Sequence, residues 1–266
     1  MPTKLPKTLL TADGQPITLP QQAEADRLDL TVMVTCFNEA ALIRDTLDTV
    51  RAVLAHFSYR YEVLIYDDAS QDDSVAVINV YITANHLGTT FFLIANATNQ
   101  GIGVNYFRAA ERGRGEYFYI VHGDNASPPE ALTRVLGLMG QADMIVPYFR
   151  TRLFATRYNC DHRPFSRRLL SLLFSWTIRL LSGHELRYFN GWVLHKRANV
   201  LANRVQAYGL GFQAELLCKI LREPTVEYLE VRQHNLDESG STTAFRLKNV
   251  VSVLGSLGRI ALGRIS

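Results

Sequence analysis

The stretch GEYFYIVHGDNASPPEAL, residues 115–132, contains the transition that decides the fold. An apolar run, residues 117–121, ends in the polar turn HGD (residues 122–124), and a double proline then opens a helical pattern at Pro129. Proline suits the first turn of a helix, where its missing N–H would find no partner in any case. We therefore predict a strand, a polar turn and a helix in succession, and in α/β proteins such strand ends are where ligands bind.

Strands and helices alternate along the first half of the chain. Short apolar runs rich in β-branched and aromatic residues predict strands, and apolar residues three and four positions apart predict helices. The predicted strands are 30–35, 61–66, 89–96, 116–121 and 143–149, and the predicted helices are 39–57 and those starting at 72, at about 103 and at about 129. This alternation predicts an α/β protein with a mostly parallel central sheet covered by helices on both faces.

The second half of the chain is less regular. It contains a long helical pattern, a strand-like segment, a further helix and a last strand, at residues 165–183, 186–196, 211–223 and 225–233. From Ala244 onward, an apolar stripe is combined with four basic residues and no acidic one, which predicts a basic amphipathic helix; the basic residues are Arg246, Lys248, Arg259 and Arg264. We expect an extended arm (1–28), one α/β domain (29–240, with halves 29–150 and 151–240) and a basic amphipathic tail (241–266).

The composition of the chain indicates no particular class of binding partner. The chain has 266 residues, of which 47% are hydrophobic, and its net charge of +3 is too small to indicate a nucleic-acid partner. Three distant cysteines without a C-x-x-C spacing indicate neither a disulfide framework nor a zinc site, which favours a reducing compartment. The first residues lack the apolar core of a secretory signal, and no window is long and apolar enough to span a bilayer. We expect a soluble or surface-bound protein.

Polar residues follow each of the first four predicted strands. They are Thr35 to Glu39, Asp67 to Ser70, Asn99 to Gly103 and His122 to Asp124. The carboxyl ends of parallel strands share one edge of the sheet, so these four clusters should converge on one crevice. The Asp67-Asp68 pair with Ser70 could alone be a helix-capping turn, but four clusters in register are hard to attribute to capping.

A dinucleotide-binding site is the first alternative for this crevice. The segment GIGVNY has the first two glycines of G-x-G-x-x-G, but Tyr106 stands where the third glycine belongs. The segment also follows the third predicted strand instead of the first. We therefore reject a nicotinamide-binding site.

Four segments taken in order carry a resemblance to a known family. TVMVTCFNEAALI, YEVLIYDDASQDDS, NQGIGVNYFRAAERGRGEYFYIVHGDN and GLGFQAELLCKIL resemble glycosyltransferase family 2, and most closely its dolichyl- or polyprenyl-phosphate sugar synthase branch. The likeness covers about residues 29–240. It implies a GT-A fold and an inverting enzyme that moves a sugar from a nucleoside-diphosphate sugar to a polyprenyl phosphate.

The resemblance also implies a donor site. The residues that match its donor-binding motifs are Thr35, Phe37, Asn38 and Glu39 on the base and ribose side, Asp67 and Asp68, of which the second typically holds the base, and Asn99, Gly101 and Gly103 in a loop beside the donor. The family's D-x-D motif falls on His122, Gly123 and Asp124. Asp124 is therefore the expected catalytic contact to a divalent cation, Mg²⁺ or Mn²⁺, on the donor diphosphate.

His122 departs from the family pattern, because it replaces the first carboxylate of the motif. Imidazole is accepted more readily by Mn²⁺ than by Mg²⁺, which prefers oxygen ligands. His122 is therefore a candidate metal ligand, a candidate hydrogen-bond partner of the donor, or a strand-end histidine with a structural role only.

The second half offers groups for an acceptor phosphate. Such an acceptor is already anionic and needs positioning by cationic and hydroxyl groups. The candidates are Arg163, Ser166 and Arg167 at the start of the long helix, and Arg232, expected to be catalytic, with Ser239 and Ser241 in the Gly-Ser turn after the last strand. A solvated helix start is the structural alternative for the first group. Where related synthases often carry D-x-x-S-G, this chain has Arg187 and Asn190, and the Q-x-x-R-W signature of processive synthases is absent.

A lipid acceptor requires access to a membrane. Residues 169–178 are uncharged and have arginines at their edges, which suits a helix lying at an interface. With the basic tail, this predicts a cytoplasmic protein bound peripherally to the anionic inner face of a membrane. The alternatives are that both helices simply pack on the sheet, that the acceptor is a glycan hydroxyl with Glu215 as base, or that the protein binds nucleotide sugars without catalysis. The sequence predicts no oligomeric state.

Overall fold

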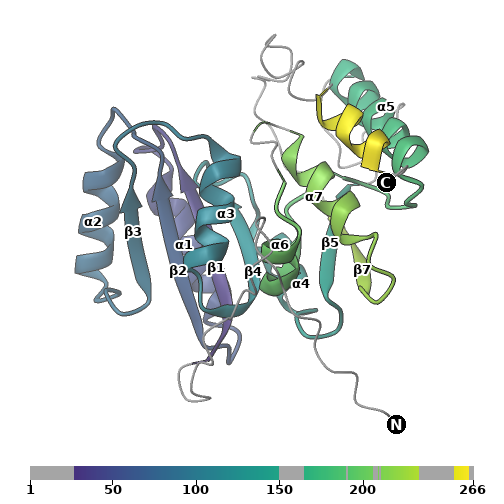
Figure 1. Ribbon diagram of the computed structural model, residues 1–266. Coiled ribbons are helices and arrows are strands. Elements are labelled where there is room, and N and C mark those ends of the chain that lie inside the picture. The colour runs from purple at the N-terminus through teal and green to yellow at the C-terminus, as the bar shows by residue number, and fades with distance from the viewer. Residues whose placement is uncertain are drawn as a thin grey trace, which may run out of the picture.

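The computed structural model describes residues 27–149, 165–189, 191–205, 209, 211–233 and 255–263. Within them, one seven-stranded sheet carries helices on both faces (Figure 1). The strands are β1 (Leu28–Cys36), β2 (Tyr61–Asp67), β3 (Phe91–Ala95), β4 (Gly115–His122), β5 (Met144–Phe149), β6 (Leu194–Lys196) and β7 (Tyr228–Gln233). The labelled helices are α1 (Ile43–Leu54), α2 (Ser74–Ala84), α3 (Ile102–Arg112), α4 (Pro129–Leu136), α5 (Phe165–Ser182), α6 (Arg197–Ala202) and α7 (Phe212–Ile220).

The sheet confirms the predicted α/β class. Its strand order is β3-β2-β1-β4-β6-β5-β7. β1, β2, β3 and β4 are parallel, and so is the β5–β7 pair, whereas the short β6 runs antiparallel to both of its neighbours. Two antiparallel steps through β6 restore the original direction, so the carboxyl ends of β5 and β7 lie at the same edge of the sheet as those of β1, β2 and β4.

Two apolar cores explain why the sheet is covered on both sides. One core joins the sheet to α1, α2 and α4, through residues such as Leu47, Ile78 and Leu132. The other joins it to α3, α5, α6 and α7, with Ile178 of α5 and Phe212 of α7 among its buried members. Strands that are buried on both faces need apolar residues at consecutive positions, and the run in β1 from residue 32 to 34 is fully buried.

Two parts of the second half differ from the prediction. The segment 186–196 was predicted to be strand-like, but only Leu194–Lys196 forms a strand. Its earlier part contributes Leu186 and Phe189 to the core without pairing, so apolar residues there mark burial instead of a strand. The helix α6 that follows was not predicted, because its six residues are too few to show a helical period.

Residues 255–263 form a helix, so the described part of the predicted basic tail is helical. Its Ile260 is buried in the same core as α5 and α7. Its Arg259 donates from Nε to Glu215 of α7 at 2.9 Å. This helix therefore packs on α7. The predicted arm, 1–28, lies almost wholly outside the described residues.

Candidate active site

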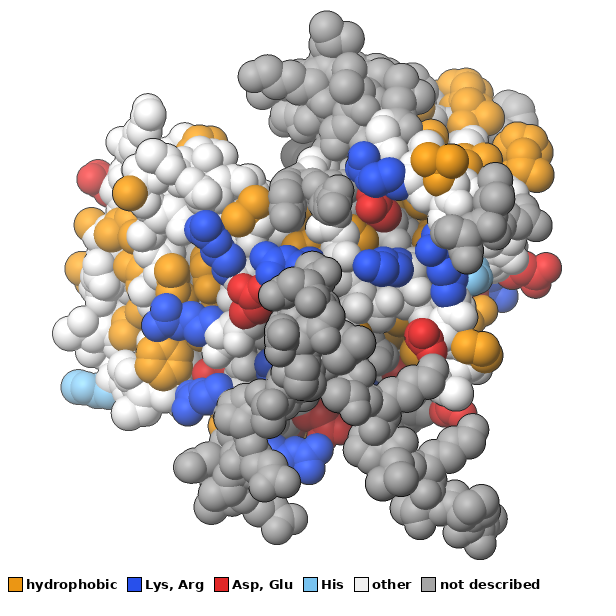
Figure 2. All heavy atoms as spheres, in the orientation of Figure 1, with side chains coloured by type: hydrophobic (Ala, Val, Ile, Leu, Met, Phe, Trp, Pro, Cys, Tyr) orange, Lys and Arg blue, Asp and Glu red, His pale blue; other side chains and the backbone are white. Residues whose placement is uncertain are grey.

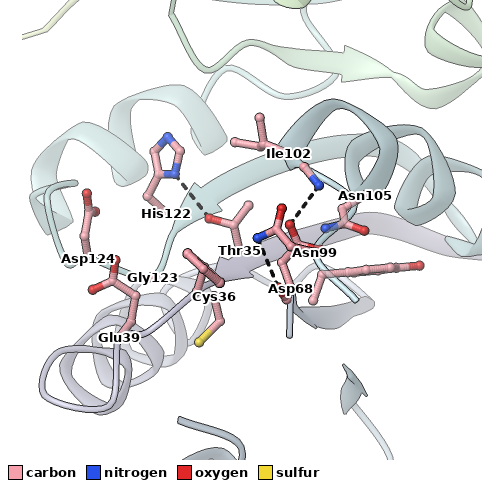
Figure 3. A pocket seen from close by; sticks show the side chains of 13 residues that line it. Thr35, Cys36, Glu39, Asp68, Asn99, Ile102, Asn105, His122, Gly123 and Asp124 are labelled. Atoms are coloured by element: carbon pink, nitrogen blue, oxygen red, sulfur yellow. Dashed lines mark hydrogen bonds between the residues drawn. The ribbon is translucent and has the colours of Figure 1, made fainter. Parts of the chain in front are cut away.

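The predicted convergence of polar turns is present in the structure. A crevice of about 330 Å³ opens at the carboxyl edge of β1, β2 and β4. We call this cavity the crevice; it is lined by Thr35, Cys36, Phe37, Glu39, Tyr66, Asp68, Asn99, Gly101, Ile102, Asn105, His122, Gly123 and Asp124. Figure 3 shows Glu39 and Asp124 at one end, Asp68, Asn99 and Asn105 at the other, and Thr35 and His122 between them.

Two carboxylates form the first end. Burial raises the pKa of Glu39 above its usual value, and the negative charges of Asp124 and Asp72 raise it further. The Asp124 carboxylate is exposed, and its Oδ1 accepts a hydrogen bond from the Ala126 N–H at 3.1 Å. Two carboxylates that repel each other across an open crevice favour a cation or a proton between them.

Gly123 allows the turn after β4, which carries Asp124, to approach the turn after β1, which carries Glu39. A Cβ added there would lie 2.3 Å from the carbonyl oxygen of Thr35, which is far below any van der Waals contact. The glycine therefore lets the turn after β4 pass directly against β1, and this close approach places Asp124 beside the Glu39 turn.

His122 occupies the centre of the crevice. It pairs with Thr35 in the β1–β4 register, and its Nδ1 lies 3.2 Å from Thr35 Oγ1 (Figure 3). Its ring contacts Trp192 edge-to-face, with 3.9 Å between the ring centroids. Burial lowers the pKa of His122, although the Asp124 charge acts to raise it, and a lowered pKa favours the neutral imidazole at pH 7.

The tautomer of His122 decides what its other nitrogen does. If Nδ1–H donates to Thr35, Nε2 carries a lone pair that can ligate a metal ion. If the Thr35 hydroxyl donates to Nδ1, Nε2 carries the proton and can donate to an anionic ligand. Thr35 and Trp192 hold the imidazole ring from two sides. Nε2 has the same position whether it ligates a metal ion or donates to an anionic ligand.

Asp68 forms the second end by holding the loop before α3. Its Oδ1 accepts from Asn96 Nδ2 at 2.9 Å and from the Gln100 N–H at 2.8 Å, and its Oδ2 accepts from the Gly101 N–H at 2.9 Å. Burial alone would raise the pKa of Asp68, but hydrogen bonds from Gln100, Asn105, Asn96 and Gly101 lower it. Gly101, with φ of 83°, provides the left-handed turn that starts α3.

Three predicted donor residues do not line the crevice. Asp67 accepts hydrogen bonds from the N–H and the hydroxyl of Ser70, and Asn38 accepts from the Gln71 N–H at 2.8 Å while its own N–H donates to Ser70. Asn38 therefore holds the turn after β1 against the turn after β2, and Asp67 closes the turn after β2 on itself. Gly103 is buried in α3.

The crevice also contains residues that the sequence did not single out. Tyr66, the residue before Asp67 at the end of β2, and Asn105 in the first turn of α3 contribute to its wall, beside Ile102 of the predicted cluster. The position of Asn105 one helical turn after Gly101 was the available signal, because residues four apart share a helix face. Trp192 lies in the segment 186–196, directly after the stretch compared with D-x-x-S-G, and nothing in that pattern pointed to its contact with His122.

Of the predicted acceptor residues, Arg232 alone has a side chain that the structure describes. Arg163, Ser239 and Ser241 lie outside the described residues, as does Asn190, and Ser166 and Arg167 lie in α5 with side chains that are not described. Arg232 is exposed on β7, at the same edge of the sheet as the crevice. β7 is three strand positions from β4, a separation of about 14 Å, so Arg232 does not belong to the crevice wall.

Two other second-half residues have defined partners. Glu215, the candidate base for a hydroxyl acceptor, is paired with Arg259 and lines a different cavity, so its placement gives no support to that role. Arg187 lies over the Tyr148 ring at 4.7 Å, and its Nε is 3.6 Å from Glu230. Arg187 stands where related synthases often have the aspartate of D-x-x-S-G, and its side chain is held by an ion pair and an aromatic ring.

The crevice offers few protein ligands for a metal ion. Among the described residues, no three His, Cys, Asp or Glu side chains are arranged to hold a metal ion. Mg²⁺, however, usually takes only one or two carboxylates from the protein and its other ligands from water and substrate phosphates. An exposed Asp124 beside Glu39 fits that kind of shared site.

Known proteins with related sequences match part of the chain. The family model for glycosyl transferase family 2 matches residues 31–189. An undecaprenyl-phosphate 4-deoxy-4-formamido-L-arabinose transferase of Pseudomonas savastanoi pv. phaseolicola is 23% identical over 122 residues, which are 46% of this chain and 36% of that protein. A protein of the same description from Pseudomonas syringae pv. syringae is 22% identical over 122 residues, which again are 46% of this chain and 36% of that protein. The match thus spans about a third of the length of these curated relatives.

Solved structures share the fold. Glucosyl-3-phosphoglycerate synthase of Mycobacterium tuberculosis in complex with UDP aligns with a TM-score of 0.60 and 18% identity over 88% of this chain and 81% of that one. A mannosyltransferase of Pyrobaculum calidifontis in complex with GDP-Man and Mn²⁺ aligns with a TM-score of 0.53 and 16% identity, over 80% and 59%. These likenesses confirm the predicted GT-A fold, and the family match covers more than half of the residues. The chain therefore belongs to glycosyl transferase family 2.

Proposed function

We propose that this protein transfers a sugar from a nucleoside-diphosphate sugar to a polyprenyl phosphate at a membrane surface. The donor would occupy the crevice, with its base and ribose beside Thr35, Phe37 and Asp68 and its diphosphate toward Asp124. The curated relatives are described as undecaprenyl-phosphate sugar transferases, and two solved structures with the same fold hold UDP or GDP-Man.

The observation that carries the lipid acceptor is the exposed apolar face of α5. Five large side chains recur there at helical spacing and face solvent: Phe165, Leu169, Leu173, Trp176 and Leu180. Trp176 is 61% exposed and Leu173 is 52% exposed, whereas Ile178 of the same helix is fully buried. A helix with one apolar face in the core and a second in solvent is suited to lie in a membrane interface. Within the described residues, no helix is long and apolar enough to cross a membrane.

The chemistry requires the crevice to stabilise a leaving diphosphate. A divalent cation shared between Asp124 and the donor would neutralise the charge that develops on the leaving group. Glu39 adds negative charge beside Asp124, which strengthens the attraction for such a cation. His122 would contact the same group through Nε2, as a metal ligand or as a donor to a phosphate oxygen.

The acceptor phosphate needs no base because it is already anionic. Arg232, with Ser239 and Ser241, and Arg163, Ser166 and Arg167 at the start of α5 are the proposed groups for holding it. A polyprenyl chain would then extend along the apolar face of α5. The inner face of a membrane remains the proposed location.

Product extraction tests the acceptor. The protein is incubated with labelled nucleotide sugars, Mg²⁺ or Mn²⁺, and a polyprenyl phosphate in detergent, and the label that passes into organic solvent is counted. We expect label in the organic phase only when the prenyl phosphate is present. Label that passes to a soluble glycan instead would replace the lipid acceptor by a hydroxyl acceptor, and absence of donor turnover with every sugar and metal would indicate a binding protein.

A further inference from the structure

A second cavity lies outside the crevice and is lined mainly by cations. Its volume is about 250 Å³. We call it the basic cavity; it is lined by Arg204, Val205, Glu215, Lys219, Arg222, Arg259 and Ile260. Four positive side chains and one carboxylate therefore face the same small space, which has a net positive charge.

The basic cavity is remote from the crevice along α3. Arg204 stacks on Phe107, with its guanidinium carbon 5.6 Å from the ring centroid, and forms an ion pair with Glu111. Ile102, at the start of the same helix, lines the crevice. Glu111 is nine positions after Ile102 along the helix, a rise of about 13 Å, so a ligand in one cavity does not contact the other.

Two of the four cations keep donors available. Arg259 donates hydrogen bonds to Glu215 at 2.9 Å and to Ser256 at 3.2 Å. Arg204 forms an ion pair with Glu111. Lys219 makes one hydrogen bond, from Nζ to the Arg204 carbonyl oxygen at 2.9 Å, which leaves two of its three protons. Among the described residues, no carboxylate pairs with Lys219 or Arg222.

The location of Arg222 is fixed by packing. A Cβ built on Gly263 would lie 1.9 Å from Nη2 of Arg222, so the guanidinium rests against the backbone of helix 255–263. Glu215, the carboxylate among the described lining residues, pairs with Arg259, so holding Arg222 beside Lys219 costs free energy unless a further anion joins them. Guanidinium and ammonium groups that converge in this way suit a phosphate group, which accepts several charged hydrogen bonds at once.

The surroundings of the cavity favour a phosphate at a membrane. Figure 2 shows Lys and Arg side chains (blue) gathered right of centre, over the region of α7, and hydrophobic side chains (orange) at the upper right, over α5. Both groups belong to one face of the molecule. A membrane that accepts the apolar face of α5 would bring its headgroup phosphates close to this basic region.

We infer that the basic cavity binds a phosphate group, separately from the sugar-transfer site. The sources with this chemistry are a phospholipid headgroup and a free phosphate. The inference does not depend on the proposed transferase activity, because its residues neither line the crevice nor have a role in that reaction.

The test compares the double variant Lys219→Gln with Arg222→Gln to the control Arg108→Gln with Arg112→Gln. Arg108 and Arg112 are exposed on α3 and line neither cavity, so both proteins lose two positive charges. One arm measures the melting temperature with inorganic phosphate and with chloride at matched ionic strength. The other measures sedimentation with phosphatidylcholine vesicles that contain or lack phosphatidic acid.

We expect the wild type and the control to bind phosphatidic acid vesicles about tenfold or more tightly than the double variant, given the attraction of each basic residue to an anionic surface. A melting temperature raised by inorganic phosphate in the wild type and control alone would also support the site and identify free phosphate as a ligand. Equal behaviour of the double variant and the control in both arms would overturn the inference. Unchanged melting temperatures in chloride check that both variants fold.

Discussion

At the scale of single residues, Asp124 is the side chain on which the proposed chemistry depends most. Asp124→Asn keeps the volume of the side chain and removes its charge. We expect transfer to fall about 10²- to 10³-fold, the effect of removing one electrostatic group from a transition state. Steady-state kinetics with saturating donor would measure it.

For the same variant we expect equal or higher stability, in contrast to its loss of activity. The Asp124 charge is one cause of the raised pKa of Glu39, so the folded state carries a repulsion at neutral pH that the variant removes. The melting temperature of Asp124→Asn should therefore equal or exceed that of the wild type at pH 7. A clear loss of stability together with the loss of activity would mean that Asp124 is structural, and the assignment of the site would fail.

Asp68 is predicted to act on stability as well as on donor binding. Asp68→Ala leaves the Gln100 and Gly101 N–H groups and the Asn96 amide without their acceptor. We expect a loss of about 1 to 3 kcal/mol in the free energy of unfolding and a higher KM for the donor, because the loop beside the donor loosens. Urea unfolding with Asp45→Ala, an exposed carboxylate on α1, provides the matched control.

The pH dependence of this effect follows from the lowered pKa of Asp68. The folded pKa lies below the unfolded value, which is near 3.8. The stabilisation is therefore complete above the unfolded pKa and is lost as the pH falls through the folded pKa. The difference between the wild type and Asp68→Ala should thus shrink in acid, and a difference that stays constant down to the lowest pH at which both proteins fold would exclude an ionised Asp68 as its source.

The residue scale also shows the limit of prediction from sequence. The four polar turns could be predicted to meet, because parallel strands end at one edge of a sheet. Which side chain of a turn enters the crevice could not, since Asp67 and Asp68 are adjacent and have the same chemistry. Asp67 closes its own turn through Ser70, and Asp68 reaches the loop before α3. That difference depends on how the turn after β2 packs against the loop before α3, which the sequence pattern does not determine.

At the scale of elements, α5 has one apolar face that is buried in the core and another that is exposed to solvent. Its apolar residues were visible in the sequence, but a helix that is apolar nearly all round is equally compatible with full burial. Only the packing of α5 beside α7 and helix 255–263 shows which side chains remain in solvent. For the same reason the segment 186–196 was mistaken for a strand, because burial without pairing has the same composition as a buried strand.

A charge on the exposed face of α5 tests its proposed role. Leu173→Glu with Trp176→Glu should reduce binding to vesicles tenfold or more, because burying each large apolar side chain contributes about 1.5 to 3 kcal/mol. Val80→Glu is the control, since Val80 is 67% exposed on α2 and belongs to no proposed membrane surface. Both proteins should melt at nearly the wild-type temperature. Equal vesicle binding by the two would mean that α5 does not contact the membrane.

At the scale of the whole molecule, membrane binding should separate into two contributions that respond differently to salt. The apolar face of α5 acts through burial of hydrocarbon surface, which salt does not weaken. The basic cavity acts through charge, which is screened over a Debye length of about 8 Å at physiological ionic strength and about 3 Å at 1 M. Because the two surfaces belong to different elements, variants can remove them one at a time.

Vesicle sedimentation across a salt series measures both contributions in the same protein. At low salt, each variant set should bind phosphatidic acid vesicles more weakly than the wild type. As salt rises toward 1 M, the deficit of Lys219→Gln with Arg222→Gln should disappear, because the wild type loses the same electrostatic attraction. The deficit of Leu173→Glu with Trp176→Glu should persist, because the binding that remains in the wild type is apolar. If high salt releases the wild type from the vesicles completely, the face of α5 contributes no binding of its own, and the proposal of a lipid acceptor loses the observation that supports it.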